Sequence, residues 1–452
     1  MRVAVGGRPT SRCTRPRYRG RIDRVASGTG PCGAVVEVPQ AFGVGRRMPI
    51  AAKLPEQRLT WLSPIGSGCS DGGGNSADQS LPAVYRKERR VNFAERIDAV
   101  LHHARPDRVP FAPYDNLVPR GDFARELRDR GMGLCVRLGT IWSEQPNVVA
   151  QTHSEGDVQI TAYSTPKGSV SMRKKTHLGR IADGSVLEEE GLIKGAEDYE
   201  AVLFMIDDAI FHVDNSIYYN AARDLGTDGV IFHGGVGPPY DASRGCFGSV
   251  YGLAQWVYAQ QDEPLRFARL VEALERSIER RFPLLLDCPA EVIGMGAVNG
   301  HYGPRRFAEC VLPFYRSHVA RLHARGKICT LHAHASNLRA FAELIGQTGV
   351  DVVEAFTPPP VGDLSLADAR AAWGADTIVW VNFPETVFWY GADQTRDYTL
   401  DLLGQDPRPD RLVIGMTEMG TYGVTDDESE RVFKAGMRAI MDAIDEFSGA
   451  RL

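Results

Sequence analysis

The segment KICTLHAHAS, residues 327–336, is the starting point for interpreting this sequence. Residues 328–331 are a β-favouring run and predict a strand. The strand leads into His332 and His334, and because alternate side chains of a strand share a face, both imidazoles are expected to point the same way. A helix-type run follows at 337–344. Two histidines in this position are candidate metal ligands, and the alternative is one core histidine beside a solvated one.

The composition is that of a globular protein with one or two domains, since the chain has 452 residues, of which 43% are hydrophobic and 24% charged. There is no run of 18 apolar residues, so no membrane association is expected. The eight cysteines form no C-x-x-C pair. Their spacing favours free thiols in a reducing, cytoplasmic compartment over a disulfide framework.

The formal charge of −5 is distributed unevenly. Residues 1–90 contain sixteen Lys and Arg against six Asp and Glu, which leaves an acidic body of charge −15. An acidic body argues against nucleic acid as the main partner. The first 90 residues are rich in Arg, Gly, Pro and Ser, and 63–80 has the composition of a linker. An Arg-rich transit peptide, a basic nucleic-acid arm and a disordered or non-native extension are the three interpretations, and the last is favoured.

From residue 91 the sequence alternates strands with helices, which predicts parallel βαβ units. Over 91–452 this pattern suits a closed (β/α)8 TIM barrel as a single catalytic domain. An open doubly wound sheet is the alternative, but neither G-x-G-x-x-G after a strand nor G-x-x-x-x-G-K-[ST] is present. Alternation around 166–168 predicts a β-hairpin inserted at 158–173. Strands are expected at 108–112, 229–232, 291–294, 328–332, 350–356, 377–381 and 411–416. Helices are expected at 92–103, 198–208, 250–260, 264–282 (ended by Pro283), 304–325, 337–346, 366–373, 395–403 and 428–447.

Polar groups terminate the predicted strands, where the chemistry of such barrels is found. A carboxylate in an apolar strand, such as Glu354 in VVEAF or Glu418 in VIGMTEMG, is costly unless it is paired or metal-bound. Each glutamate alone can be explained by a buried arginine partner. Together with His332 and His334 they can hold one divalent ion. Zn²⁺ is favoured because imidazole is its preferred nitrogen donor, while Mn²⁺ and Fe²⁺ stay open since no cysteine is in the set.

Several segments resemble the uroporphyrinogen decarboxylase superfamily: NFAERIDAVLHHARPDRVPF, GPRRFAECVLPFYRSHVARLHARGKICTLHAHASN, GVDVVEAF, NFPE and VIGMTEMG. The resemblance covers about 92–447 and implies a (β/α)8 fold. It also implies either decarboxylation or methyl transfer between corrinoid proteins and thiols at zinc. Cobalamin-independent methionine synthase is a more distant relative.

The methyltransferase branch resembles this chain at its metal site. His332 matches the histidine of the family's H-x-C pattern and His334 its cysteine, Glu354 matches the following glutamate, and Glu418 the last cysteine. Both cysteines are therefore replaced, which removes two negative sulfurs from the ion. The decarboxylase branch is metal-free and relies on an R-Q-A-G-R motif, which is absent here although Asp115 and Arg120 are near. Methyl transfer is therefore favoured over a metal-free carboxy-lyase.

The predicted reaction is attack of a metal-activated nucleophile on a methyl donor, either a small molecule or a corrinoid protein acting as partner. His301 and His233 are the candidates for proton transfer, with a solvated loop histidine as the alternative for each. The substrate pocket is predicted to be lined by Tyr240, Asn382 and Tyr422. A barrel that only docks other proteins is a third hypothesis, which the buried glutamates disfavour. The sequence leaves the oligomeric state open.

Overall fold

The protein is described from a computed structural model, in which the described residues all lie in one compact unit, Ala52–Leu452. The predicted basic extension, 1–90, lies outside the described part of the chain. The structure describes residues 91–176, 187–244, 250–298, 300, 302–334, 337–416, 424 and 426–449.

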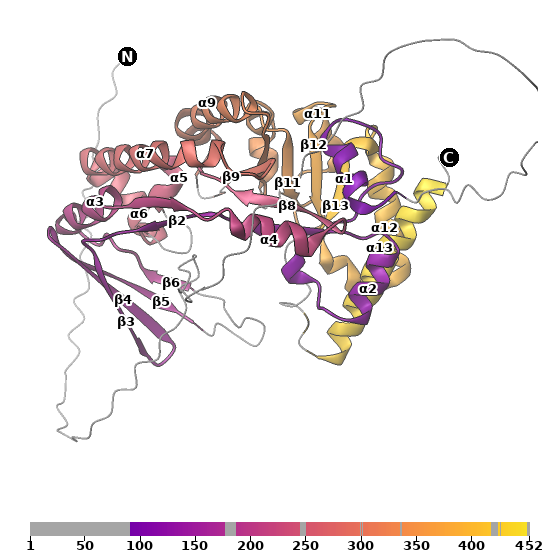
Figure 1. The fold of residues 1–452 in the computed structure, drawn as a ribbon, viewed down its shortest axis with the longest axis horizontal. Helices are drawn as coiled ribbons and strands as arrows, with labels where there is room; N and C mark the ends of the chain where they lie inside the picture. The colour runs from indigo at the N-terminus through magenta and orange to yellow at the C-terminus, as the bar shows by residue number, and fades with distance from the viewer. Residues whose placement is uncertain are drawn as a thin grey trace, which may run out of the picture. The chain divides into compact units, whose positions relative to one another are not determined.

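The central element is a curled, parallel, seven-stranded sheet in the order β1-β8-β9-β10-β11-β12-β13 (Figure 1). Consecutive strands from β8 onward are neighbours and are connected through helices, so the predicted βαβ repeat is confirmed. The strands are β1 (Leu134–Leu138), β8 (Gly229–Gly234), β9 (Val292–Ala297), β10 (Ile328–His332), β11 (Val352–Phe356), β12 (Ile378–Asn382) and β13 (Leu412–Gly415).

The predicted first strand of the barrel does not form a strand of its own. The segment 110–114 instead makes three backbone hydrogen bonds with the β13 edge of the sheet and two with the β1 edge. Ala112 N–H donates to Ile414 at 2.8 Å on one edge, and Cys135 N–H donates to Pro113 at 2.9 Å on the other. Pro110 and Pro113 lack a donor N–H, which limits regular pairing here. The predicted closed eight-stranded barrel is thus confirmed only as a curled seven-stranded sheet with helices.

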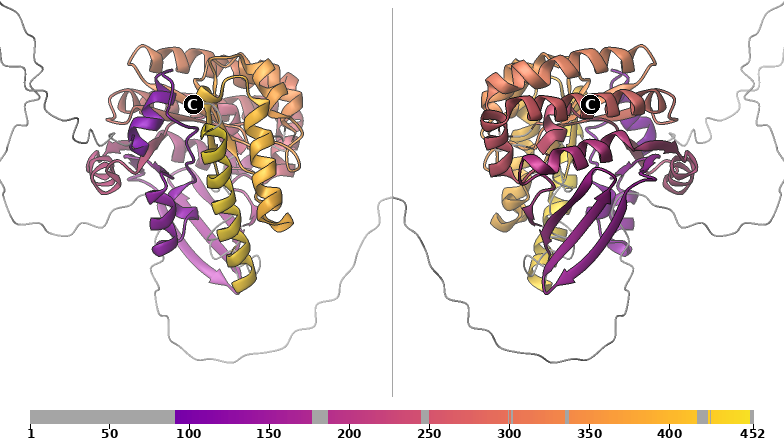
Figure 2. Two further views of the ribbon diagram at one scale, coloured as in Figure 1. Left: turned by 90° about the vertical axis from the view of Figure 1, so that its right-hand side faces the viewer. Right: turned by 90° about the vertical axis from the view of Figure 1, so that its left-hand side faces the viewer.

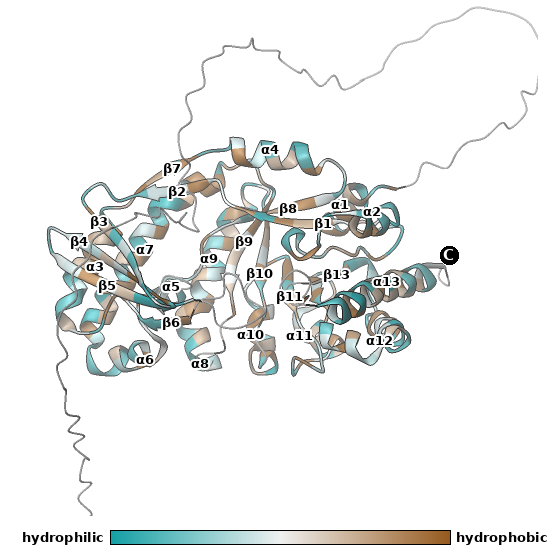
Figure 3. Cartoon of the chain, turned by 90° about the horizontal axis from the view of Figure 1, so that it is seen from below, coloured by the Kyte–Doolittle hydropathy of each residue, from teal (hydrophilic) through white to brown (hydrophobic). Residues whose placement is uncertain are grey.

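Helices surround the sheet, and α12 and α13 run side by side (Figure 2). These helices carry both hydrophilic and hydrophobic residues, as expected where one face packs on the sheet (Figure 3). No helix among the described residues has the length and hydrophobicity to cross a membrane. The helices are α1 (Phe93–Leu101), α2 (Asp122–Asp129), α3 (Tyr199–Asp207), α4 (Ser216–Leu225), α5 (Pro239–Arg244), α6 (Leu253–Asp262), α7 (Pro264–Leu286), α8 (Pro304–Arg306), α9 (Leu312–His323), α10 (Ala342–Gly346), α11 (Leu366–Trp373), α12 (Ala392–Gln405) and α13 (Asp427–Gly449).

Two sequence predictions about these elements are wrong. The helix expected to stop at Pro283 continues to Leu286, because Phe282 and Leu285 are fully buried and hold its last turn in place. Burial of two such side chains offsets the roughly 3 kcal/mol cost of an interior proline. Strand β1 was not expected, since LCVRL is short and carries an arginine.

The inserted hairpin is confirmed and belongs to a larger antiparallel sheet. That sheet has the order β3-β4-β5-β6, and a separate two-stranded ribbon pairs β2 with β7. Every residue of β3 is exposed. The bounds are β2 (Ile141–Glu144), β3 (Val149–Glu155), β4 (Val158–Thr165), β5 (Gly168–Lys175), β6 (Leu187–Glu190) and β7 (Ile210–Val213).

The parallel sheet has two hydrophobic faces, because its strands are covered on both sides. The outer face packs against the helices. The inner face forms a separate cluster that also includes α1, whose start is fixed by a capping box between Asn92 and Glu95. Strand residues of the inner cluster are Cys135, Phe232, Val292, Val352, Ile378, Trp380 and Val413.

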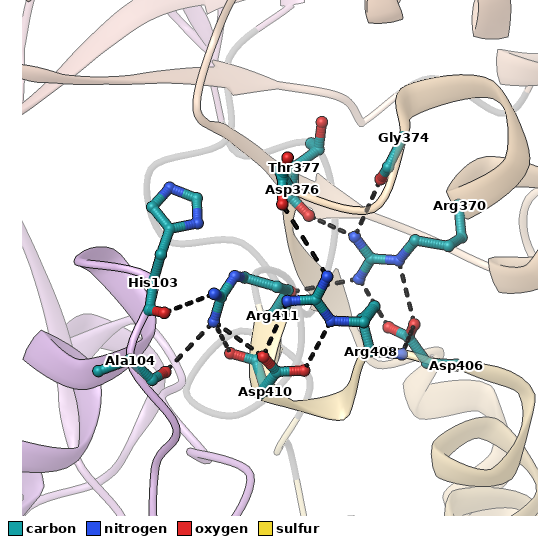
Figure 4. Close-up of polar contacts among 10 residues, drawn as sticks. All are labelled: His103, Ala104, Arg370, Gly374, Asp376, Thr377, Asp406, Arg408, Asp410 and Arg411. Atoms are coloured by element: carbon teal, nitrogen blue, oxygen red, sulfur yellow. Dashed lines mark hydrogen bonds and ion pairs between the residues drawn. The ribbon is translucent and has the colours of Figure 1, made fainter.

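The N-terminal ends of β12 and β13 are joined by a network of ion pairs and hydrogen bonds, in which the Arg370–Asp406 pair is buried (Figure 4). Arg370 holds Asp406 with two parallel hydrogen bonds of 3.0 and 2.7 Å, and their side chains are 5% and 0% exposed. The remaining donors of Arg370 reach the carbonyls of Gly374, Thr377 and Arg411. This network satisfies the guanidinium and locks α11 to the start of β13.

Candidate functional site

The predicted site lies at the C-terminal ends of β10 and β11, on the inner face of the sheet. His332 and Glu354 are direct partners in the parallel register of the two strands. Val352 belongs to the inner cluster, and because Glu354 is two residues further along, it faces the same way. The strand alternation therefore brings an imidazole and a carboxyl group from neighbouring strands to one place.

His332 and Glu354 are hydrogen-bonded to each other. Nδ1 of His332 is 2.7 Å from Oε2 of Glu354, whose side chain is 3% exposed. The second oxygen, Oε1, is buried and has no hydrogen-bond partner among the residues that the structure describes. A buried carboxyl oxygen without a partner is expensive, so this atom is a plausible place for a ligand to bind.

Burial determines the protonation of this pair. It raises the pKa of Glu354 to about 8, and it lowers the pKa of His332 to about 3, with nearby Arg137 and His334 lowering it further. Both shifts favour the neutral form, because little water is present to stabilise separated charges. At neutral pH the protonated carboxyl of Glu354 therefore donates its hydrogen bond to Nδ1 of His332.

A local irregularity follows Glu354 in β11. Ala355 has a φ of 58°, and the pairing of β11 with β12 shifts between Val353 and Phe356. A left-handed alanine costs roughly 1–2 kcal/mol, so the surrounding structure must impose it. Bulges of this kind commonly redirect side chains next to active sites.

His334 lies beside the pair, with its ring centroid 5.7 Å from that of His332. These residues can hold a metal ion: they offer two imidazoles and a carboxyl group with an unused oxygen, which are donor types that Zn²⁺ accepts. The ligand atoms of these residues lie further apart than the ligands of a bound ion. Within the described ranges, the one group whose three ligand atoms lie within 4.8 Å of one another is His323, Cys329 and Asp351.

That other group lies at the opposite end of β10 and has a structural explanation. Asp351 accepts the backbone N–H of Cys329 at 2.7 Å and pairs with His323 Nε2 at 2.8 Å. Burial raises the pKa of the Cys329 thiol far above its usual range, so the thiolate that a metal requires is disfavoured. The hydrogen bonds account for the cluster without an ion.

The structure does not bring His233 to this pair. Its neighbours Phe232 and Gly234 occupy inner positions, so His233 faces the helices. Its Nε2 accepts the N–H of Thr140 at 2.9 Å, and burial lowers its pKa to about 4. It is a neutral histidine that ties β8 to the turn after β1, which gives no support to a role in proton transfer.

The predicted substrate-binding residues have different surroundings. Asn382 ends β12 two residues after inner Trp380 and donates to the hydroxyl of Thr357 at 2.9 Å. Tyr240 is buried among aromatic rings and donates to Gln260 at 2.6 Å. Asn382 is therefore placed on the site's face of the sheet, and Tyr240 is held in an aromatic core. The other predicted site residues, Glu418, His301 and Tyr422, lie outside the described residues.

The sequence analysis missed two residues of the site. The hydroxyl of Tyr114 lies 3.5 Å from Nδ1 of His332, and the guanidinium carbon of Arg137 lies 4.9 Å from the centre of the Tyr114 ring. The arginine was detectable in principle, because a charged residue at alternate spacing from Cys135 in an apolar strand is unusual. The tyrosine carries no such signal.

Comparison with known proteins gives little further information. No protein-family model and no curated protein matches the sequence. Among solved structures, a methyltransferase from Methanosarcina mazei is similar, with 13% identity and a TM-score of 0.46, over 79% of this chain and 99% of the other. A fructose-bisphosphate aldolase from Slackia heliotrinireducens has 13% identity and a TM-score of 0.27, over 52% of this chain and 71% of the other. Similarities this low do not allow fold or function to be transferred.

Proposed function

We propose that this chain is a metal-dependent enzyme, and that its reaction is methyl transfer to a metal-activated nucleophile. One observation carries the proposal: at the C-terminal ends of parallel strands, a buried glutamate bonded to a histidine keeps one carboxyl oxygen without a partner among the described residues. Such strand ends are where enzymes of this architecture place their chemistry. Most buried polar atoms in folded proteins have a hydrogen-bond partner, so an oxygen that lacks one calls for an explanation.

The metal would be held by His332, His334 and Glu354, with Glu418 as the predicted fourth ligand. Zn²⁺ is favoured by the imidazoles, and Mn²⁺ or Fe²⁺ are compatible with a set that lacks thiolates. Glu354 has two possible roles in this arrangement. It can bind the ion directly through its unpartnered oxygen, or it can orient His332 through Nδ1 while Nε2 binds the ion, as carboxylates commonly do behind metal-bound histidines.

A bound ion of this kind supplies a lowered pKa to a coordinated thiol or hydroxyl group, which makes an anionic nucleophile available. The chain's own residues keep water away from Glu354, which is 2% exposed. Methyl transfer, with a corrinoid protein as possible donor and partner, is preferred because of the motif resemblance to the uroporphyrinogen decarboxylase superfamily.

A second candidate is metal-free proton transfer, as in a carboxy-lyase. It is favoured by one observation: with its pKa raised to about 8, Glu354 keeps a proton at neutral pH and can donate it. The two candidates differ in their need for a metal, which makes them separable.

The test is metal content together with activity in the full-length protein. We expect one equivalent of zinc per chain by elemental analysis, lost in His332→Ala but kept in His323→Ala, which alters the other histidine–carboxylate cluster. Loss of methyl from methylcobalamin in the presence of a small thiol should follow the same pattern. Full activity after chelation would disprove the metal-dependent mechanism and support proton transfer by Glu354.

A further inference from the structure

Arg137 is a cation on the inner face of the sheet, and no acidic residue in the described part of the chain is paired with it. Its register partner Phe232 and its neighbour Cys135, two residues earlier on β1, both belong to the inner cluster. Arg137 therefore faces the same side as His332. Across the part of the chain that the structure describes, it takes part in no ion pair and no hydrogen bond; its one contact of this kind is with a ring.

That contact holds the guanidinium close to the histidine–glutamate pair. Arg137 lies over the ring of Tyr114, and the hydroxyl of the same tyrosine lies next to His332. One tyrosine thus separates the cation from the pair. Arg137 is exposed, so a solute can reach it.

The adjacent inner positions carry no side chains. Gly234 on β8 lies two residues after Phe232, at the next inner position, and its register partner on β9 is Gly294. A Cβ atom built on either glycine would meet its nearest neighbour only at 3.6 Å, an ordinary contact distance. No side chain from these positions therefore stands between Arg137 and the ends of β8 and β9.

Among the described residues, no carboxylate forms an ion pair with Arg137. Arg370 is an arginine with a structural role. It is buried, and its guanidinium is hydrogen-bonded to Asp406 and to backbone carbonyls. Arg137 differs in both respects, because it is exposed and keeps all its N–H donors available for a planar, bidentate contact.

We propose that Arg137 binds an oxyanion of the substrate, a carboxylate, sulfonate or phosphate group, and that Tyr114 holds the guanidinium in place for it. This inference rests on the proposed function in one respect: the reacting end of the same molecule is taken to lie at His332 and Glu354. Arg137 is then a specificity-determining residue, and the substrate is a small acid.

The experiment measures thermal unfolding of the full chain, treated with chelator, in acetate, sulfate or phosphate at constant ionic strength. We expect at least one of these anions to raise the Tm of the wild type by about 3 °C or more at saturation. Arg137→Gln should lose this rise and Arg137→Lys should keep part of it. Arg105→Gln removes an exposed arginine near the opposite end of the sheet, and it should respond like the wild type.

General salt effects raise the Tm of every variant alike, so specific anion binding is measured by the difference in the Tm rise between variants. A rise in Arg137→Gln equal to that of the wild type would overturn the proposal, and so would the absence of any rise in the wild type. Zinc content separates this inference from the proposed function. Arg137→Gln should keep its zinc, whereas His332→Ala should lose zinc and still respond to the anion.

Discussion

The parallel sheet buries one polar pair at each end, and the two pairs differ in how completely they are satisfied. At the N-terminal ends, Arg370 and Asp406 form a bidentate ion pair supported by backbone carbonyls. At the C-terminal ends, His332 and Glu354 share one hydrogen bond, and one oxygen of Glu354 has no partner within the described ranges. The carboxyl group is buried in both pairs, whereas the His332 side chain is 24% exposed and that of Arg370 is 5% exposed.

This difference indicates that the Arg370–Asp406 pair stabilises the fold, whereas the His332–Glu354 pair serves a chemical function. A buried charge must be fully paired to be tolerated, and the Arg370–Asp406 network meets that requirement. The His332–Glu354 pair avoids the cost differently, by remaining neutral. A neutral, half-satisfied pair weakens the apo fold but keeps an acid, a base and a ligand atom available. Ala355, directly after Glu354, has a strained backbone, and strained residues cluster at functional sites, which also supports a functional role for this end of the sheet.

The largest expected effect is at the N-terminal end. Asp406→Ala leaves Arg370 buried without its counterion, so unfolding free energy in urea should fall by about 3–5 kcal/mol. The matched control replaces both partners, Arg370→Met with Asp406→Leu, and should cost much less because no charge is left unpaired. A loss below about 1 kcal/mol in Asp406→Ala would mean that this pair is no more important to stability than a surface contact.

At the C-terminal end, removing the titratable group should stabilise the apo protein. The folded-state pKa of Glu354 is raised from 4.5 to about 8, so its favourable contribution is complete below pH 4.5 and is lost as pH rises through 8. Glu354→Gln should therefore raise unfolding free energy by on the order of 2–4 kcal/mol at pH 8, and by little near pH 4.5. Chelator-treated protein is compared by urea titration at both pH values. Glu343→Gln, an exposed change of equal charge, should shift stability by less than about 0.5 kcal/mol. An equal gain at both pH values would show that the carboxyl is not held neutral.

A smaller change in stability is expected at Ala355, the strained residue at the C-terminal end of the sheet. Ala355→Gly should stabilise the protein by about 1 kcal/mol, because glycine adopts a positive φ without steric conflict. Ala369→Gly, in helix α11, is the control of opposite sign and should lose about 1 kcal/mol or more. Thermal unfolding measures both, and destabilisation by Ala355→Gly would mean that the backbone here is relaxed.

The smallest effect is expected for the partly exposed pair at the N-terminal end of β10. His323 and Asp351 have side-chain exposures of 41% and 27%, so their interaction is screened by water. His323→Ala should change unfolding free energy by no more than about 0.5 kcal/mol. A loss comparable to that of Asp406→Ala would show that burial is not what distinguishes these pairs.

Local patterns were sufficient for much of the fold. The run ICTLH predicts β10 with its observed bounds, and LADARAAW predicts α11 equally well. Apolar strands and amphipathic helices leave signals within a few residues of each other. The pairing of His332 with Glu354 was anticipated only as a convergence of strand ends, and the hydrogen bond between them was not.

The sequence by itself determined that strands and helices alternate and that ionisable residues stand where the strands end. Tertiary structure alone decided that Arg137 and Tyr114 join His332, that His233 faces the helices, that α7 passes Pro283, and that 110–114 bridges two edges without becoming a strand. The reason is that these outcomes depend on register and on packing between segments far apart in the chain. Local periodicity carries no information about which distant strand becomes a neighbour, or which buried atom is left without a partner.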